Sequence, residues 1–110
     1  MKKSDINISV ELDDQNVPEK IFWEADDMET GGKKESKSMS LSLWDHGTKN
    51  TLRIDLWSKD MPVEEMKRFY IDCIGGMAQS ILNSTGDEYM SSELNAVCDK
   101  FVEHLKKELN

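Results

Sequence analysis

The hydrophobic period changes once along this chain, near residue 58, from two residues to the spacing of a helix. Before that point, apolar residues recur at every second position in four stretches, which is typical of strands with one buried face. After it they recur at every third or fourth position in two long stretches, which is typical of amphipathic helices. The sequence therefore predicts an α+β fold, with four strands followed by two helices.

The first two alternating stretches flank the turn residues 13–16, "DDQN", and predict a β-hairpin. Pairing Leu12 with Val17 across this turn places Ile8 opposite Ile21. Apolar side chains then share one face of the hairpin.

A second hairpin follows the segment 26–34, "DDMETGGKK", which has no periodicity and is expected to be a flexible loop. Alternation resumes from about Glu35 to Trp44 and again before Trp57. If Asp45 pairs with Asn50 around a four-residue loop, apolar residues oppose one another on one face. The expected pairs are Leu43 with Leu52, Leu41 with Ile54 and Met39 with Leu56, and on the other face Ser40 with Asp55.

Two helices account for the rest of the chain. Asp60 is the expected N-cap of the first and Gly86 its C-terminal stop, while the second begins near Asp87 or Ser91. The glycines at 75–76 indicate a close approach or a kink. We expect both helices to pack on the apolar face of one four-stranded antiparallel sheet, which makes residues 1–110 a single domain with a two-layer sandwich.

The charge excludes some partners. Fourteen basic and 22 acidic residues give a net charge of −8, which repels nucleic acids and anionic membrane surfaces. No apolar run approaches the roughly 20 residues of a membrane span, and no apolar segment follows the N-terminal lysines as in a signal peptide. We therefore expect a cytoplasmic protein that inserts into no membrane. Cys73 and Cys98 lie in apolar helical patterns, as expected of reduced core thiols.

The sequence offers no catalytic motif. His46 and His104 have no cysteine or carboxylate at ligand spacing, so no metal site is expected. The Gly-Gly-Lys-Lys run lacks the strand and helix of a phosphate loop. No catalytic residue and no cofactor is expected, and the chain is predicted not to be an enzyme. A thiol-dependent enzyme that uses Cys73 or Cys98 is kept as an alternative.

The face of the sheet opposite the apolar one is unusual, because three aromatic residues stand there among serines and charges. They could be strand-end residues folded over loops or covered by segment 26–34. Alternatively, they anchor a protein partner or a second copy, as aromatic residues and arginine do in interfaces. The candidate protein-binding residues are Phe22, Trp44, Arg53, Asp55 and Trp57.

Three segments carry a family resemblance: "TLRIDLWSKDMPVEEMKRFY", "VELDDQNVPEKIFWEADD" and "LSLWD". They resemble the gliding motility protein GldC family of gliding bacteria of the Bacteroidetes group, and the similarity runs over essentially the whole chain. The resemblance implies a small cytoplasmic accessory protein of the gliding machinery, with no established enzymatic activity or cofactor and no catalytic residues to carry over.

Together these observations predict a non-enzymatic interaction module of gliding motility. Its partner would be a protein of the motility machinery, or a second copy in a homodimer. The alternative is a small acidic protein that resembles a secretion chaperone and holds an extended client segment in a groove or along a strand edge.

Overall fold

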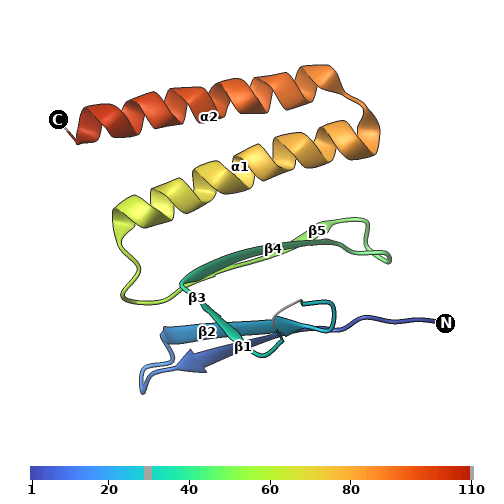
Figure 1. The fold of residues 1–110 in the computed structure, drawn as a ribbon, viewed down its shortest axis with the longest axis vertical. Coiled ribbons are helices and arrows are strands. Elements are labelled where there is room, and N and C mark those ends of the chain that lie inside the picture. Colours follow the sequence, from blue (N-terminus) through green and yellow to red (C-terminus); the bar gives the residue numbers. More distant parts are fainter. Residues whose placement is uncertain (29–30, 110) are drawn as a thin grey trace. The chain divides into compact units, whose positions relative to one another are not determined.

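A computed structural model describes residues 1–28 and 31–109 and divides into two compact units, Met1–Pro62 and Val63–Asn110. In the described residues the first unit is built from strands and the second from helices (Figure 1). The α+β class is therefore confirmed. The packing of the helices on a sheet, and the single domain, stay predictions.

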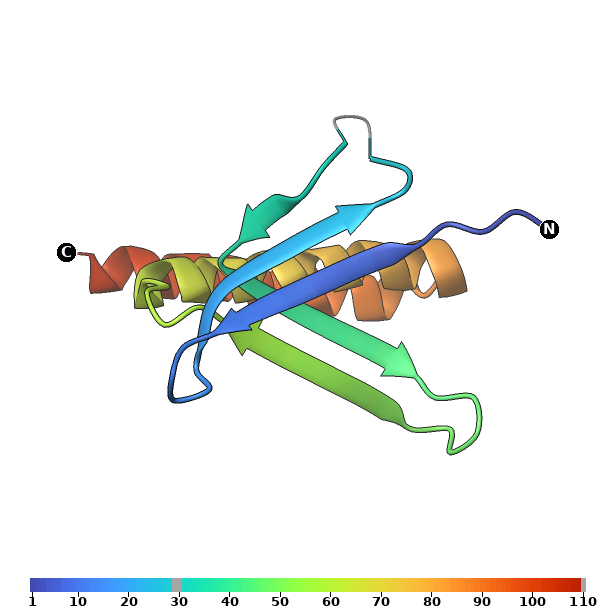
Figure 2. The same cartoon turned by 90° about the horizontal axis from the view of Figure 1, so that it is seen from below.

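The described residues of the first unit form two antiparallel sheets, so the prediction of one four-stranded sheet is wrong. The first sheet has the order β1-β2-β3, and the second pairs β4 with β5. Their bounds are β1 Ile6–Leu12, β2 Pro18–Ala25, β3 Lys34–Ser36, β4 Ser38–Trp44 and β5 Thr51–Trp57. Figures 1 and 2 show β4 and β5 in a different layer from β1 and β2, and crossing them.

The extra strand arises because one predicted strand, from Glu35 to Trp44, is divided between both sheets. β3 pairs with β2 and begins at Lys34, inside the segment expected to be a loop, whereas β4 pairs with β5. The chain leaves one ladder and enters the other at Lys37. Strands that change sheets in this way form the corners of crossed sheet packings. Of the expected loop, residues 29–30 lie outside the described part of the chain.

The register of the first hairpin differs from the prediction by two residues, since Ile21 pairs with Val10 rather than Ile8. One residue of this shift arises in the turn, which closes between Asp13 and Val17 rather than between Leu12 and Val17. The Asp13 N–H donates to the Val17 carbonyl oxygen at 2.9 Å. The other comes from an irregularity after Glu11, where the register shifts. A shift of two keeps every side chain on its expected face.

The second hairpin has the predicted register throughout. Leu43 pairs with Leu52, and the remaining pairs follow in step to Ser38 and Trp57. The predicted four-residue loop is closed by the Asp45 N–H, which donates to the Asn50 carbonyl oxygen at 2.9 Å.

Among the described residues of the first unit, the buried apolar one is Ile21, which is 1% exposed and lies in the middle strand of the three-stranded sheet. It pairs with Val10 on one side and Ser36 on the other. Because β2 has a paired strand on each side, neighbouring residues flank the Ile21 side chain on both sides. This explains why the described core of the unit centres on β2.

The helical unit is an antiparallel hairpin of α1 Val63–Thr85 and α2 Glu88–Glu108. Gly86 ends α1 as predicted, with a φ of +73° that favours glycine. Asp87 is the N-cap of α2, and its carboxylate accepts a hydrogen bond from the Met90 N–H at 2.9 Å.

The prediction that Asp60 is the N-cap of α1 is wrong. The N-cap position comes directly before Val63, and Asp60 lies two residues before that position. Its carboxylate accepts hydrogen bonds from Ser58 and Lys37 instead.

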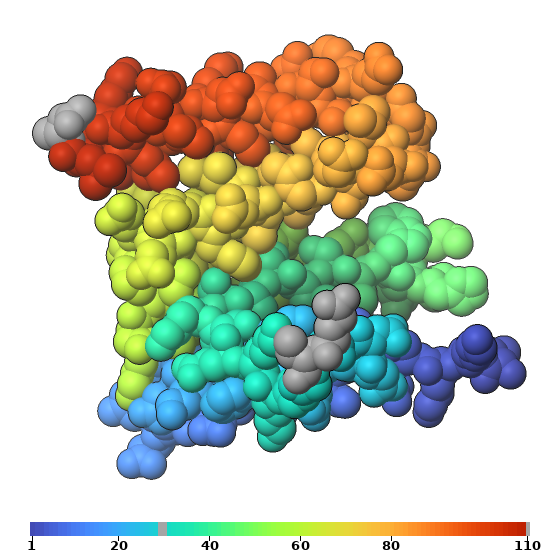
Figure 3. All heavy atoms as spheres, in the orientation of Figure 1, coloured from blue at the N-terminus to red at the C-terminus, as the bar shows by residue number. Residues whose placement is uncertain are grey.

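Small residues bring the two helices together near their connection. In Figure 3 the two helices lie along each other as neighbouring layers of atoms. Ala78 and Ser91 are buried, and the Ser91 hydroxyl donates to the Ala78 carbonyl oxygen at 2.8 Å. A Cβ at Gly75 would lie 3.9 Å from the Cys98 Sγ, an ordinary contact, so this glycine marks a near approach of the helices. At the other end, Lys67 Nζ lies 3.0 Å from a Glu108 carboxylate oxygen. In the part of the chain that is described, no helix has the length and apolar character needed to cross a bilayer.

Candidate protein-binding face

The candidate face is the polar side of the β4–β5 hairpin, defined by strict alternation along both strands. Every second residue of each strand lies on it, and each faces a partner on the other strand. The cross-strand pairs are Ser38 with Trp57, Ser40 with Asp55, Ser42 with Arg53 and Trp44 with Thr51. The hairpin thus places four of the five predicted site residues on one face.

The centre of this face is a charged cluster. Arg53 Nη2 lies 3.1 Å from Asp55 Oδ1 and donates to the Ser40 Oγ, also at 3.1 Å. The hydrogen bond with the Ser40 hydroxyl, and then the Arg53 guanidinium, hold the pKa of Asp55 below its ordinary value. Asp55 is therefore ionised at neutral pH and holds the Arg53 guanidinium in position.

The two tryptophans lie at opposite ends of the face. Trp44 ends β4 and pairs with Thr51, the first residue of β5. Trp57 ends β5, six residues after Thr51. At about 3.4 Å per residue they stand roughly 20 Å apart. Trp44 is 68% exposed and Trp57 is 51% exposed. They are thus two separate aromatic contacts on either side of the charged cluster, too far apart for one anchor.

Phe22 does not belong to this face. It lies in the middle strand of the other sheet, where it pairs with Ser9 on β1 and Glu35 on β3. Its side chain is half-buried. The single binding face expected from the sequence is therefore wrong for Phe22, because its premise was one continuous sheet.

The apolar side of the same hairpin also has accessible side chains. Leu43, Leu52 and Ile54 are each about half exposed, with Ile54 at 49%. Leu43 and Leu52 are direct cross-strand partners, and Ile54 faces Leu41. Both faces of this two-stranded sheet therefore carry large side chains in contact with solvent.

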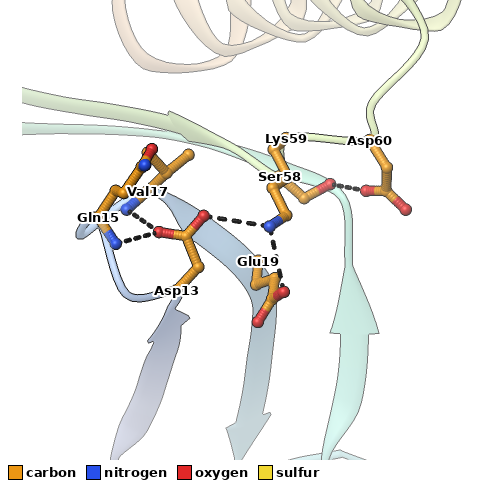
Figure 4. A network of polar contacts seen from close by, with 7 residues as sticks. All are labelled: Asp13, Gln15, Val17, Glu19, Ser58, Lys59 and Asp60. Atoms are coloured by element: carbon orange, nitrogen blue, oxygen red, sulfur yellow. Dashed lines mark hydrogen bonds and ion pairs between the residues drawn. The ribbon is translucent and has the colours of Figure 1, made fainter.

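A polar network that the sequence did not predict joins the turn of the first hairpin to the end of β5 (Figure 4). Lys59 Nζ lies 3.1 Å from Asp13 Oδ2 and 3.2 Å from Glu19 Oε1. The other Asp13 oxygen accepts hydrogen bonds from the N–H groups of Gln15 (2.8 Å) and Val17 (3.0 Å). The Val17 N–H, then Lys59, lower the pKa of Asp13, while Asp13 and Glu19 raise the pKa of Lys59.

The same network continues on the other side of β5. Ser58, only 1% exposed, donates from its hydroxyl to an Asp60 carboxylate oxygen at 2.7 Å, and Lys37 Nζ lies 2.9 Å from the other oxygen. Both contacts lower the pKa of Asp60, Ser58 more than Lys37. The sequence indicated only that Asp13 lies in a turn, because its partner Lys59 is 46 residues away. These contacts hold the two sheets of the first unit together and suggest no reaction.

No alternative chemical site emerges from the described residues. They contain no group of three or more His, Cys, Asp or Glu residues able to hold a metal ion. Both cysteines are half-buried rather than buried, and the Cys98 Sγ lies 3.6 Å from the Ile71 carbonyl oxygen. His104 Nε2 lies 2.9 Å from Glu108 Oε1, and the two exposed side chains are one helical turn apart on α2.

A family model described as "Gliding motility-associated protein GldC-like" matches residues 18–107. The chain belongs to the GldC-like family. The matched range includes β2 to β5 and almost all of both helices, and with them every residue of the candidate face. No curated protein and no solved structure matches the chain significantly. The GldC-like chain is therefore a gliding motility-associated protein.

Proposed function

We propose that this GldC-like protein is a non-enzymatic, cytoplasmic interaction module that binds a protein of the gliding machinery through the polar face of the β4–β5 hairpin. The observation that carries the proposal is the exposure of Trp44 and Trp57 on either side of the Arg53–Asp55 pair. Tryptophan and arginine are, with tyrosine, the residues most enriched among the energetically dominant contacts of protein interfaces. Their exposure on a polar sheet face is costly to solubility unless a partner covers them.

The geometry favours a partner with an extended footprint. The indoles stand roughly 20 Å apart along the hairpin, so a single side-chain pocket on the partner cannot receive both. The charged cluster between them supplies a fixed polar contact, since Asp55 and Ser40 already hold the guanidinium of Arg53 in place. A folded surface with two apolar hollows and a polar centre would suit this arrangement.

The test is to replace the indoles one at a time, Trp44→Ala and Trp57→Ala, in the full chain. Tyr89→Ala is the matched control, because Tyr89 is 73% exposed and lies on α2, in the other unit. Affinity capture from gliding cells, with mass spectrometry, identifies the bound machinery protein, and colony spreading reports motility. We expect both Trp variants to lose capture and spreading while Tyr89→Ala retains them.

Unchanged capture and spreading in both Trp variants, with a wild-type circular dichroism spectrum, would show that the face has no such role. The secretion-chaperone alternative rests on the unpaired strand edges of the β4–β5 sheet, where an extended client can add a strand. It predicts that the captured protein is a secreted or surface client in an unfolded form. In that case capture would survive both Trp substitutions.

A further inference from the structure

The outer edge of β5 is an unpaired strand edge. Within the described residues, β5 pairs with β4 alone. The Asn50 carbonyl and the Ser58 N–H both bond towards β4, at 2.9 and 2.8 Å, so the backbone groups of even-numbered residues face β4. Odd-numbered residues face away, as Lys59 shows, because its N–H donates to the Pro18 carbonyl oxygen instead. Thr51–Trp57 thus presents a row of unpaired donors and acceptors without a proline to block it.

The sequence of β5 is complementary to itself about its central residue, Ile54. If two copies pair antiparallel with Ile54 opposite Ile54, then Leu52 lies opposite Leu56 and Arg53 opposite Asp55. Arg53 and Asp55 are odd-numbered, so these opposite charges fall at the positions where the two edges exchange backbone hydrogen bonds. Apolar residues meet on one side of the sheet and opposite charges on the other.

The charges also select this register over its neighbours. A pairing centred on Arg53 would place two guanidinium groups opposite each other, and one centred on Asp55 would oppose two carboxylates. Like charges directly opposite are destabilising. The outer edge of β4 offers no such choice, because a pairing centred on Leu41 sets serine against serine at the corresponding positions.

We propose that a second copy of this chain binds the outer edge of β5 in the register centred on Ile54, which gives a symmetric dimer with the strand order β4-β5-β5-β4. The pairing would extend the two-stranded sheet to four strands, a common sheet size, and would pair the open edge of β5. The symmetry is that of most homodimers, in which one patch binds its own copy. Arg53 serves both its own and the partner's carboxylate, since a guanidinium carries five N–H donors.

The dimer shares Arg53 and Asp55 with the proposed binding face, and Trp57 would lie opposite Thr51 of the second copy, but Trp44 on β4 takes no part in the strand pairing. The edge lies in the plane of the sheet, and the indoles of Trp44 and Trp57 stand above that plane. Strand pairing would, however, place two copies of the Trp–Arg–Asp arrangement on one continuous surface. Trp44→Ala should therefore lose partner capture and stay dimeric, so failure of the dimer and failure of the binding face are distinguishable.

Charge reversal and mixing test the inference in the full chain. Arg53→Asp leaves two acidic residues at the pairing positions, and Asp55→Arg leaves two basic ones. Sedimentation velocity over a dilution series should show a wild-type dimer, and in each variant a dimer dissociation constant raised about tenfold or more, since attraction becomes repulsion at two symmetric pairs. Glu11→Arg, a charge reversal on the edge strand β1 of the other sheet, is the control and should remain dimeric.

Mixing distinguishes pairing between chains from the Arg53–Asp55 contact within each chain. An equimolar mixture of Arg53→Asp and Asp55→Arg restores opposite charges only between chains, so a heterodimer should form. Circular dichroism checks that each variant is folded. A monomeric wild type, dimers that persist in both variants, or folded variants whose mixture stays monomeric would each overturn the proposal.

Discussion

The two hairpins of the first unit, β1–β2 and β4–β5, have similar apolar patterns but different numbers of neighbouring strands. β1 and β2 gain a third strand, and Ile21 in the middle strand becomes almost inaccessible to solvent. Among the described residues β4 and β5 gain no further strand, and Ile54, at an equivalent inward position of its hairpin, remains 49% exposed. The same alternation therefore produces a core in one sheet and an accessible surface in the other. Whether a strand has neighbours on both sides decides which of the two results.

The hairpins also differ in how their turns are fixed. Asp13 organises the first turn and contacts Lys59 at the end of β5, so this turn is connected to the rest of its unit. Asp45 organises the second through its own loop, where it accepts hydrogen bonds from the N–H and hydroxyl of Thr48 at 2.7 and 2.9 Å. The first hairpin is thus held by long-range contacts and the second by local ones.

The largest expected difference between the hairpins is in the cost of truncating their isoleucines. Ile21→Ala should lower the free energy of unfolding by about 2–4 kcal/mol, because it opens a cavity in a closed environment. Ile54→Ala should cost about 1 kcal/mol or less, since half of its side chain is already in water. Urea unfolding at concentrations where the chain is monomeric measures both. Equal losses would mean that the two sheets are equally closed.

A smaller difference is expected for the turn aspartates. Asp13→Ala removes the acceptor of two N–H groups and the partner of Lys59, so it should lower the melting temperature more than Asp45→Ala. The folded pKa of each aspartate is depressed, Asp13 chiefly by the Val17 N–H and Asp45 chiefly by the Thr48 N–H. Each therefore stabilises the fold above its ordinary pKa of about 3.9, and that contribution is lost as the pH falls through the lowered value.

Thermal melts between neutral pH and pH values below about 3.9 measure this dependence. The wild type should lose stability on acidification, and each Ala variant should lose less, because one depressed group is gone. A steeper loss in either variant than in the wild type would contradict the assignment of these hydrogen bonds.

What the sequence could predict depended on whether an interaction was local. The register of β4–β5 was predictable because its loop has four residues and its apolar triads match in one way. The register of β1–β2 was not, because the tighter turn at Asp13 and the irregularity after Glu11 each add one residue without changing the hydrophobic pattern. Gly86 and Asp87 were predictable as helix-end residues because capping needs particular backbone angles and short side chains.

The candidate site was predictable in part for the same reason. Arg53 and Asp55 lie two residues apart on β5, and Ser40 lies opposite Asp55 on β4, as alternation indicates. Phe22 was misplaced because nothing in the pattern from Glu35 to Trp44 shows that Lys37 divides it between two sheets. The network of Lys59 could not be foreseen, since its contacts join residues distant in sequence through charged side chains, which are common at every surface.

The smallest expected effect concerns the residue with positive φ in each turn. Asn16 has a φ of 63° and Lys49 a φ of 56°. Asparagine tolerates this region, whereas lysine there has the Cβ clash that glycine lacks. Lys49→Gly should therefore stabilise the protein by about 0.5 kcal/mol, after the greater freedom of glycine in the unfolded chain offsets part of the gain. Asn16→Gly should be nearly neutral.

Lys49→Ala is the control, because it removes the same charge but keeps the Cβ, and it should give no gain in the free energy of unfolding measured in urea. If Ala and Gly at position 49 stabilise equally, the lost lysine charge, and not backbone strain, is the cause.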